Sequence, residues 1–367
     1  MQEQLTARRR ALHERPEIAF ALYETRAYLM SQIAPWHARV EMVAQVGISV
    51  FFDAGRPDTY AFRSDMDALP IAEATHAPYA SHHPGKMHAC GHDGHMAMLL
   101  ALGDWASAHL DNLKRNLLLV FQPAEESGGG GRLVVESGLL EKYRVSRAYA
   151  LHVEPMLPMG VLASRPGAFM ARASEVHVLV RGKSAHVARA SEGADALWAL
   201  CDFVTQALAF ERAMPEDCLR LLKFGQIEAG HAVNVIAGEA RLGGTMRTFD
   251  PMAFDQLRHA LSRVARACEA QYGVTFDVQL DAGYPALVND PTLFREALGA
   301  MPDFDLRTLL APSMLAEDFG FYAQALPSLM LYVGLGSGIA LHTDQFDFDE
   351  RALLCGAQVL IRLADAP

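Results

Sequence analysis

The sequence predicts an α/β protein with a mostly parallel sheet flanked by helices, into which a smaller α+β domain is inserted. Two features of the chain predict this fold class. Short apolar runs that end in polar clusters alternate with helix-like stretches, which is typical of a parallel sheet buried on both faces. Between about 174 and 286, strands with one polar face and two long helices indicate a compact α+β domain. We therefore expect residues 1–173 and 287–367 to form the first domain and residues 174–286 the inserted domain.

The elements of the first domain follow from the apolar runs. Residues 3–34 have a helical pattern that Arg15-Pro16-Glu17 interrupts. Strands are predicted at 60–62, 116–121, 148–151 and 329–333. Helix-like stretches lie between them at 94–110 and 129–142. In a parallel sheet, a site forms beyond the carboxyl ends of the strands. Polar residues follow each of the four strands, so we expect one shared site at that edge.

The inserted domain has three predicted strands and two predicted helices. The strands are at 176–180, 239–247 and 274–280, and the helices are at 193–212 and 251–271. Two helices on one face of an antiparallel sheet would bury its apolar side. The chain would then return to the first domain near residue 287.

Composition narrows the classes of partner and the location. The 367 residues are 51% hydrophobic, which is enough for two cores. Acidic residues (43) outnumber Lys and Arg (32), so nucleic acid and anionic membranes are not expected as partners. No apolar run reaches the roughly 20 residues that a membrane-spanning helix needs. The five cysteines form no CxxC pair, and the first residues do not resemble a signal peptide, so the expected location is a reducing cytoplasm.

One segment is dense in residues that bind metals. His88-Ala89-Cys90-Gly91-His92-Asp93-Gly94-His95 has three histidines, a cysteine and an aspartate in eight positions. Imidazole and thiolate are preferred ligands of zinc and related divalent metals. Single members could be surface or helix-capping residues, but packing alone explains such a density poorly. We therefore expect metal binding here, where Cys90 and His92 could reach one metal ion or two adjacent ones.

Further candidate ligands lie just past other predicted strands. Glu125-Glu126 follows an apolar run and precedes four glycines. On an irregular loop, one carboxylate can bind metal while the other acts as a general base. The pair could also be a solvated one that opens a helix. His152 and His342 lie at similar places, where a lone histidine more often makes structural hydrogen bonds. With Cys90, His92 and a glutamate, they form a candidate two-metal set.

Three residues of the inserted domain are candidates for contact with a substrate. His186, at the end of Gly182-Lys183-Ser184-Ala185-His186, could polarise a carbonyl group, although a loop histidine is more often simply exposed. Asn234 and Arg247 are similar candidates, and the planar fork of arginine suits a carboxylate. The run Gly334–Gly338 resembles part of a dinucleotide loop, but too little chain follows it to complete a βαβ unit. We interpret it as the loop that leads to His342.

Taken together, the motifs resemble those of one family over nearly the whole chain. They are Arg8–Glu17, Arg63–Ile71, Met87–Asp93, Phe121–Glu126, Leu151–Pro155, Asn234–Ile236, Gly244–Arg247 and Glu317–Gly320. The chain resembles the amidohydrolase branch of the aminoacylase and glutamate-carboxypeptidase metallopeptidases. That branch includes hippurate hydrolase, auxin-amino-acid hydrolase and N-acetyldiaminopimelate deacetylase. The resemblance implies a catalytic, metal-binding first domain and an inserted lid domain, through which a homodimer could form.

The resemblance also implies a cofactor of two divalent metal ions, which could be zinc, manganese, cobalt or nickel. The five residues that it implies as their ligands are Cys90, His92, Glu126, His152 and His342.

It assigns roles to five other residues. Glu125 would be the general base that activates the attacking water and later protonates the leaving amine. Asp65 would hold the metal ligands in place without binding metal itself. His186 and Asn234 would stabilise the oxyanion, and Arg247 would help to hold the substrate or the lid.

The implied activity is metal-dependent hydrolysis of the amide bond of a small N-acyl amino acid. Three runs, Ala171–Glu175, Ala240–Leu242 and Gly244–Thr248, look closest to the N-acetyldiaminopimelate deacetylases of lysine biosynthesis. The alternatives are a general N-acyl-amino-acid or hippurate-type hydrolase, a dipeptidase, and a non-enzymatic metal-binding protein, which the presence of Glu125 disfavours. The chain departs from the family after His186, where a common Pro-His pair is absent. This departure affects the expected substrate pocket.

Overall fold

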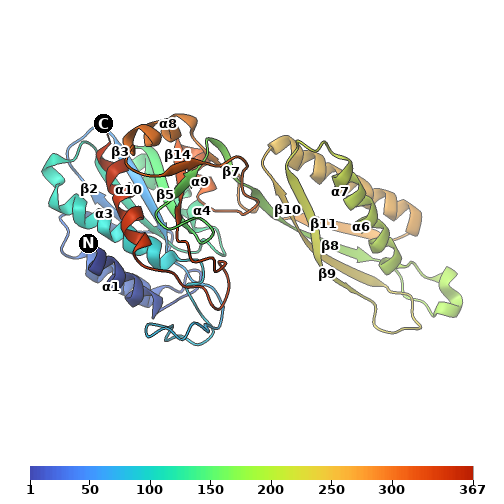
Figure 1. The fold of residues 1–367 in the computed structure, drawn as a ribbon. Helices are drawn as coiled ribbons and strands as arrows, with labels where there is room; N and C mark the ends of the chain where they lie inside the picture. Colours follow the sequence, from blue (N-terminus) through green and yellow to red (C-terminus); the bar gives the residue numbers. More distant parts are fainter. Residues whose placement is uncertain (367) are drawn as a thin grey trace. The chain divides into compact units, whose positions relative to one another are not determined.

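The computed structural model describes residues 1–366, which form two compact units (Figure 1). The large unit comprises Met1–Phe169, Leu287–Pro312 and the chain from Asp318 to Ala366. The small unit comprises Met170–Ala286 together with Ser313–Glu317. The sequence did not predict that this last short segment, which follows the insertion, belongs to the small unit. Each unit has a hydrophobic core of its own.

A mixed sheet of eight strands forms the centre of the large unit, in the order β1-β2-β4-β3-β5-β14-β6-β13. The four central strands, β4, β3, β5 and β14, are parallel, and β2 and β6 flank them in antiparallel pairings. The sheet, with helices around it, confirms the predicted fold class. The strands are β1 (Arg39–Val43), β2 (Gly47–Phe52), β3 (Thr59–Asp65), β4 (Asn116–Gln122), β5 (Val145–Glu154), β6 (Leu162–Ser164), β13 (Leu306–Thr308) and β14 (Ser328–Gly334).

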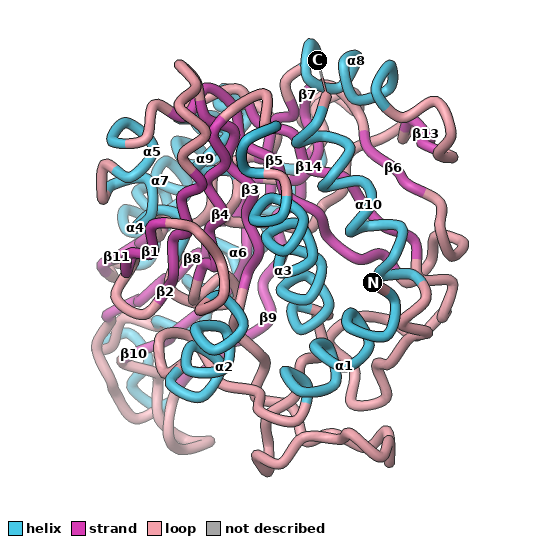
Figure 2. Tube along the Cα trace, turned by 90° about the vertical axis from the view of Figure 1, so that its left-hand side faces the viewer, coloured by secondary structure: helices cyan, strands magenta, loops and turns pink. Residues whose placement is uncertain are grey.

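Helices α1, α3 and α10 pack together beside this sheet (Figure 2). Helix α3 contacts the sheet as well as α1 and α10, which explains why it is apolar almost all round. Within residues 1–366, no helix has the length and apolar character that crossing a bilayer requires. The helices are α1 (Gln2–His13), α2 (Tyr23–Ile33), α3 (His92–Ala108), the short 3-10 helix η1 (Leu110–Asn112), α4 (Gly130–Glu136), α5 (Leu139–Lys142), α8 (Pro291–Ala300), α9 (Gly320–Ala325) and α10 (Ala352–Asp365).

The helix predicted at 129–142 is two short helices, α4 and α5. Gly138 separates them with a φ of +73°, a conformation that favours glycine and ends α4. The helical pattern at 3–34 is also divided, into α1 and α2, at the predicted break.

The small unit has a four-stranded antiparallel sheet, in the order β11-β8-β10-β9, with helices α6 and α7 on one face (Figure 1). Strand β9 was not predicted, because half of its residues are exposed and its sequence lacks a clear alternation. Two further short strands, β7 and β12, pair with each other where the chain leaves and re-enters the large unit. The elements are β7 (Gly167–Met170), β8 (Arg172–Arg181), η2 (Val187–Glu192), α6 (Ala196–Ala213), β9 (Arg220–Ala229), β10 (Glu239–Thr248), α7 (Pro251–Tyr272), β11 (Thr275–Leu280) and β12 (Leu287–Asn289).

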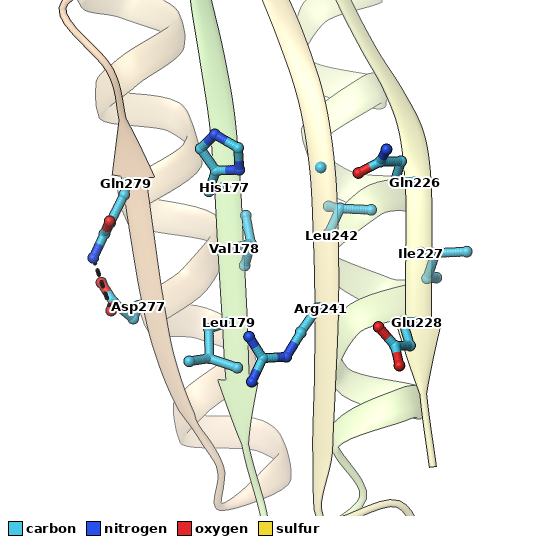
Figure 3. A pocket seen from close by; sticks show the side chains of 11 residues that line it. His177, Val178, Leu179, Gln226, Ile227, Glu228, Arg241, Leu242, Asp277 and Gln279 are labelled. Carbon is cyan, nitrogen blue, oxygen red and sulfur yellow. Dashed lines mark hydrogen bonds between the residues drawn. The ribbon is translucent and has the colours of Figure 1, made fainter. Parts of the chain in front are cut away.

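The face of this sheet away from α6 and α7 forms a shallow hollow of about 510 Å³ (Figure 3). The hollow is lined by polar side chains and a few apolar ones. Several of the polar side chains pair with neighbours, as Arg241 does with Glu239 at 2.7 Å. The polar side chains include His177, Gln226, Glu228, Arg241, Asp277 and Gln279. This solvated face accounts for the alternating pattern that predicted strands with one polar side.

Candidate active site

Polar side chains gather at the carboxyl edge of the parallel strands in the large unit. Asp65 is the last residue of β3, and His152 lies two residues before the end of β5. Glu125 and Glu126 follow β4, and His342 follows β14. Because the carboxyl ends of parallel strands meet at one edge of a sheet, these residues come together despite their separation in sequence.

Cys90 and His92 reach this edge from the turn that begins α3. Gly91, between them, has a φ of +83° and is the N-cap of the helix. A Cβ atom at Gly91 would lie 2.5 Å from Cγ2 of Val153, on β5. The positive φ and the close contact both require glycine at this position. Without a side chain, Gly91 allows the turn to pack directly against β5.

A first group of possible metal ligands consists of Cys90, His92 and His152. One ligand atom from each lies within 4.8 Å of the others, and Sγ of Cys90 is 3.5 Å from Nε2 of His152. Nδ1 of His92 lies 2.7 Å from the carbonyl oxygen of Asp67, and Nδ1 of His152 lies 2.7 Å from that of Val153. Each Nδ1–H therefore donates to a carbonyl group, and each Nε2 presents its lone pair to the group.

A second group consists of Cys90, Glu126 and His342. Nε2 of His342 is 3.3 Å from Sγ of Cys90 and 3.2 Å from Oε1 of Glu126. The three ligand atoms lie within 4.8 Å of one another. His342 has a φ of +61°, a strained conformation for a residue other than glycine and one that is frequent at functional sites. Because Cys90 belongs to both groups, it would help to hold both cations.

The chemistry of these atoms fits divalent cations. Nε2 of His92 is buried without a hydrogen-bond partner among residues 1–366, and Oε1 of Glu126 is buried against ring nitrogens of two other candidate ligands, His342 at 3.2 Å and His92 at 3.8 Å. A cation among these atoms would satisfy them. Burial lowers the pKa of His92, and it lowers the pKa of His152 to about 3, so both imidazoles are neutral, as metal ligands must be. Burial and the nearby Glu126 and Glu125 raise the pKa of the Cys90 thiol, so its thiolate needs a neighbouring positive charge.

Glu125 lies beside the first group but is not part of it. A carboxylate oxygen of Glu125 lies within 4.8 Å of a ring nitrogen of His92 and a carboxylate oxygen of Glu126. The side chain is buried, and the preceding Ala124 has a φ of +56°. A carboxylate held this close to the ligands can exchange a proton with a water molecule at the site.

Asp67 positions this turn, a role that the sequence did not reveal. Its carboxylate accepts hydrogen bonds from the backbone N–H groups of Glu125, at 2.9 Å, and Glu126, at 3.1 Å. Its own carbonyl group holds His92. Burial, with the nearby Glu126 and Asp65, raises the pKa of Asp67 well above its usual range. The alternation of polar residues at 63, 65 and 67 puts all three on one side of an extended chain, and this signal could have identified Asp67.

Asp65 and His95 form a second set of hydrogen bonds that supports the proposed ligands. Nδ1 of His95 donates to Oδ1 of Asp65 at 2.7 Å, and its Nε2 accepts from the backbone N–H of Val153 at 2.9 Å. Both ring nitrogens are therefore in use, so His95 holds neighbouring groups and is not a free ligand. Although burial opposes it, His92, His95 and Arg63 hold the pKa of Asp65 well below its usual range. Oδ2 of Asp65 lies 3.6 Å from Nε2 of His92.

A buried network beneath Asp65 connects three segments of the large unit. Arg63 donates to Asp65 at 2.8 Å and to Asp318 at 2.7 Å. Asp318 also accepts from the side chain of Gln122 at 2.8 Å and from the backbone N–H of Gly131 at 2.7 Å. This network fixes the end of β3 and the glycine-rich turn that follows Glu126.

The candidate residues of the small unit lie in more open surroundings. His186 and Asn234 are exposed and belong to adjacent backbone segments, joined by the bond from the N–H of Val187 to the carbonyl of Asn234 at 3.1 Å. Nδ1 of His186 accepts from the backbone N–H of Ala188. Arg247, on β10, is half-buried, and burial lowers its pKa. The structure thus brings His186 and Asn234 together within their unit.

The parallel strands of the large unit carry two groups of thiol, imidazole and carboxylate side chains at their carboxyl edge. This arrangement is typical of an α/β metalloenzyme. Residues 61–366 match the peptidase family M20/M25/M40, and the chain belongs to this family.

Relatives and solved structures agree with this membership. A relative from Streptococcus uberis, named N-acetyldiaminopimelate deacetylase, is 37% identical over 366 residues and covers 95% of each chain. One of the same name from Leuconostoc citreum is 35% identical, with 98% of this chain and 95% of the relative covered. A Bacillus subtilis crystal structure, described as a dinuclear metal binding peptidase from the M20 family, is 29% identical with a TM-score of 0.86. The match covers 99% of this chain and 97% of that one.

The family confirms two predictions made from the sequence. The resemblance to dinuclear metallopeptidases is correct, and the chain is an enzyme of the metal-dependent amidohydrolase class. The two ligand groups, which share Cys90, also agree with the predicted cofactor of two divalent metal ions.

Proposed function

We propose that the protein removes the acyl group from a small N-acyl amino acid by hydrolysis of its amide bond, and that N-acetyl-L,L-diaminopimelate is its substrate. One observation carries the proposal: Nε2 of His92, Oε1 of Glu126 and the buried carboxylate of Glu125 converge at the carboxyl edge of the parallel strands. The names of the relatives at 37% and 35% identity support the choice of substrate. The reaction would then supply an amine for lysine biosynthesis.

Amide hydrolysis needs a nucleophile at neutral pH, stabilisation of the oxyanion and a proton for the leaving amine. Two divalent cations held by Cys90, His92, Glu126, His152 and His342 would acidify water and polarise the carbonyl group. Glu125 takes a proton from the attacking water and later delivers it to the amine nitrogen as the C–N bond breaks. Asp67 holds Glu125 in place through its backbone N–H.

The proposed roles of the small-unit residues complete the reaction. His186 and Asn234 donate hydrogen bonds to the oxyanion, and Arg247 binds the carboxylate of the substrate. The guanidinium of Arg247 is half-buried, and its planar fork of N–H donors suits a carboxylate of the substrate.

We place the enzyme in the cytoplasm, since all five of its cysteines are free. The homodimer implied by the resemblance stays a prediction, which light scattering of the purified protein would test.

The test of the proposed function begins with protein stripped of metal by a chelator. Release of free amine is then followed with N-acetyl-L,L-diaminopimelate, hippurate, several N-acetyl amino acids and a dipeptide, while zinc, manganese, cobalt or nickel is added back singly. Turnover restored by metal, and strongest with the diaminopimelate compound, is the expected result.

The other outcomes would each correct the proposal. Broad turnover would indicate a general N-acyl-amino-acid hydrolase, with the altered loop after His186 as a cause. Preference for the dipeptide would indicate a dipeptidase. Metal binding without any turnover would contradict the proposed reaction for these substrates.

A further inference from the structure

The guanidinium of Arg9, on α1, lies between two segments that contain proposed metal ligands. The side chain is fully buried, and its Nε is 2.9 Å from Oδ2 of Asp93, the residue after His92. Its Nη2 is 2.8 Å from Oδ1 of Asp347, on the loop that follows His342. One side chain therefore connects the start of α3 with a loop that is about 250 residues further along the chain.

Aromatic rings and a third acid hold this guanidinium in one place. Its Cζ lies 4.5 Å from the ring centre of Phe348 and 5.0 Å from that of Tyr79. Nη1 is 3.6 Å from Oε1 of Glu350. The hydroxyl of Tyr79 also donates to Asp347, at 2.8 Å. A buried guanidinium between rings and paired carboxylates has little freedom, so it fixes the groups that it contacts.

The two ligand groups differ in the support that they receive elsewhere. His92 and His152 are held through their Nδ1 atoms by carbonyl groups of the sheet edge. His342 lies on irregular chain, its side chain is 51% exposed, and it has a positive φ. Its backbone N–H donates to the carbonyl of Ala89 at 2.8 Å. Asp344 and Gln345 also bind the backbone of Ala74. The contact of Asp347 with Arg9 connects the loop after His342 to the segment that carries Cys90.

We infer that Arg9 is a positioning residue, which sets the separation of Cys90 and His342 and thereby controls binding at the second metal position. The inference rests on the proposed two-metal site and adds a residue to it. Arg9 acts only through Asp93 and Asp347, and it contacts none of the proposed ligands' metal-binding atoms. Lysine could not replace it, since a single ammonium group lacks the planar fork that bridges two carboxylates.

The test compares three variants in the full-length protein. Arg9→Lys keeps the charge but removes the bridge. Asp347→Ala releases only the loop of His342 and leaves the pair of Arg9 with Asp93, and because Asp347 is 28% exposed, this variant tests the inference even if the first does not fold. Arg8→Lys is the matched control: Arg8 binds Asp104 on α3 with both amino groups, far along the helix from His92.

Cobalt is titrated into each protein after treatment with chelator, and binding is followed by the absorption of the cobalt–thiolate bond of Cys90 and by the metal retained after gel filtration. We expect wild type and Arg8→Lys to bind two equivalents tightly. In Arg9→Lys and Asp347→Ala, the second equivalent should bind about 10- to 100-fold more weakly, with the first little changed.

Two results would overturn the inference. If both variants bind two equivalents as the wild type does, or if they lose both equivalents equally, Arg9 does not control the second position. A wild-type protein that binds no cobalt would instead refute the two-metal site itself, and with it the proposed function.

Discussion

Most of the proposed site residues in the large unit are buried, whereas two of the three in the small unit are exposed. In the large unit, Cys90, His92 and Glu125 are each less than one-tenth exposed, and buried polar partners surround them. In the small unit, His186 and Asn234 are exposed on irregular segments. A buried polar group must find a partner, because its desolvation is costly, and its surroundings therefore report what it binds. An exposed group has water as a partner, so its surroundings report much less.

The largest expected effect is on the proton transfer in the large unit. Glu125→Gln keeps the shape of the side chain but cannot accept a proton, so kcat should fall about 10²- to 10⁴-fold. The metal content should stay at the wild-type value, since Glu125 is not one of the five proposed ligands. Amine release and metal analysis on the same sample measure both. An unchanged kcat would place the general base elsewhere.

The next largest effect is expected for His186, and it tests whether this exposed residue of the small unit has a catalytic role. His186→Ala should lower kcat about 10²- to 10³-fold if its imidazole stabilises the oxyanion, with metal content unchanged. His177→Ala is the matched control, because His177 is also exposed in the small unit and pairs only with Glu175. Equal activity of the two variants would contradict the role proposed for His186.

A pH-dependent effect on stability is expected at His13, a buried residue of the large unit. Nδ1 of His13 is 2.7 Å from Asp93, and its Nε2 is 3.3 Å from Glu73. Although burial opposes the charge, these bonds raise the pKa of His13 to about 9 from the model-peptide value of 6.5. A raised pKa stabilises the fold below the unfolded pKa, and this contribution disappears as pH rises through about 9.

The variant His13→Gln should therefore unfold more easily than the wild type near pH 6. The contribution of the charged imidazolium to the difference, about 3 kcal/mol at most, should vanish above about pH 9. Urea unfolding across this range measures it. A difference that does not change with pH would show that the charge on His13 contributes nothing to stability.

The smallest effect is expected on the open face of the small sheet. The side chains of Arg241 and Glu239 are 61% and 44% exposed, and such pairs contribute little. Arg241→Ala should leave kcat unchanged and alter the free energy of unfolding by less than about 0.5 kcal/mol. A clear loss of activity would reveal a function for the hollow of this face.

The sequence predicted the fold class and the candidate ligands for the same physical reason. Apolar runs that end in polar residues indicate parallel strands, and parallel strands bring their carboxyl ends to one edge. His152 and His342 could therefore be grouped before any contact was known, and Cys90 was identified by the density of possible ligands around it. The structure places their metal-binding atoms within reach of shared metal ions, although their roles stay a proposal.

The supporting contacts could not be predicted in this way. His95 belongs to the segment that is dense in possible ligands, but it binds the N–H of Val153 and the carboxylate of Asp65, which are distant in sequence. The bridge from Arg9 to Asp93 depends on how α1 packs against α3. Strand β9 escaped detection because an exposed edge strand needs no regular apolar pattern. Each of these features is set by tertiary neighbours and leaves no local pattern.

The insertion of the small unit also separates the proposed ligands in the order of their synthesis. Cys90, His92, Glu126 and His152 are all made before the small unit, and His342 is made after it. All residues of the first ligand group are thus synthesised early. The pairing of β5 with its parallel partner β14 can form only after the small unit has been synthesised. The second group cannot close until the ribosome has made the whole insertion. If the proposed ligand set is correct, the complete two-metal site can form only after the whole insertion has been synthesised.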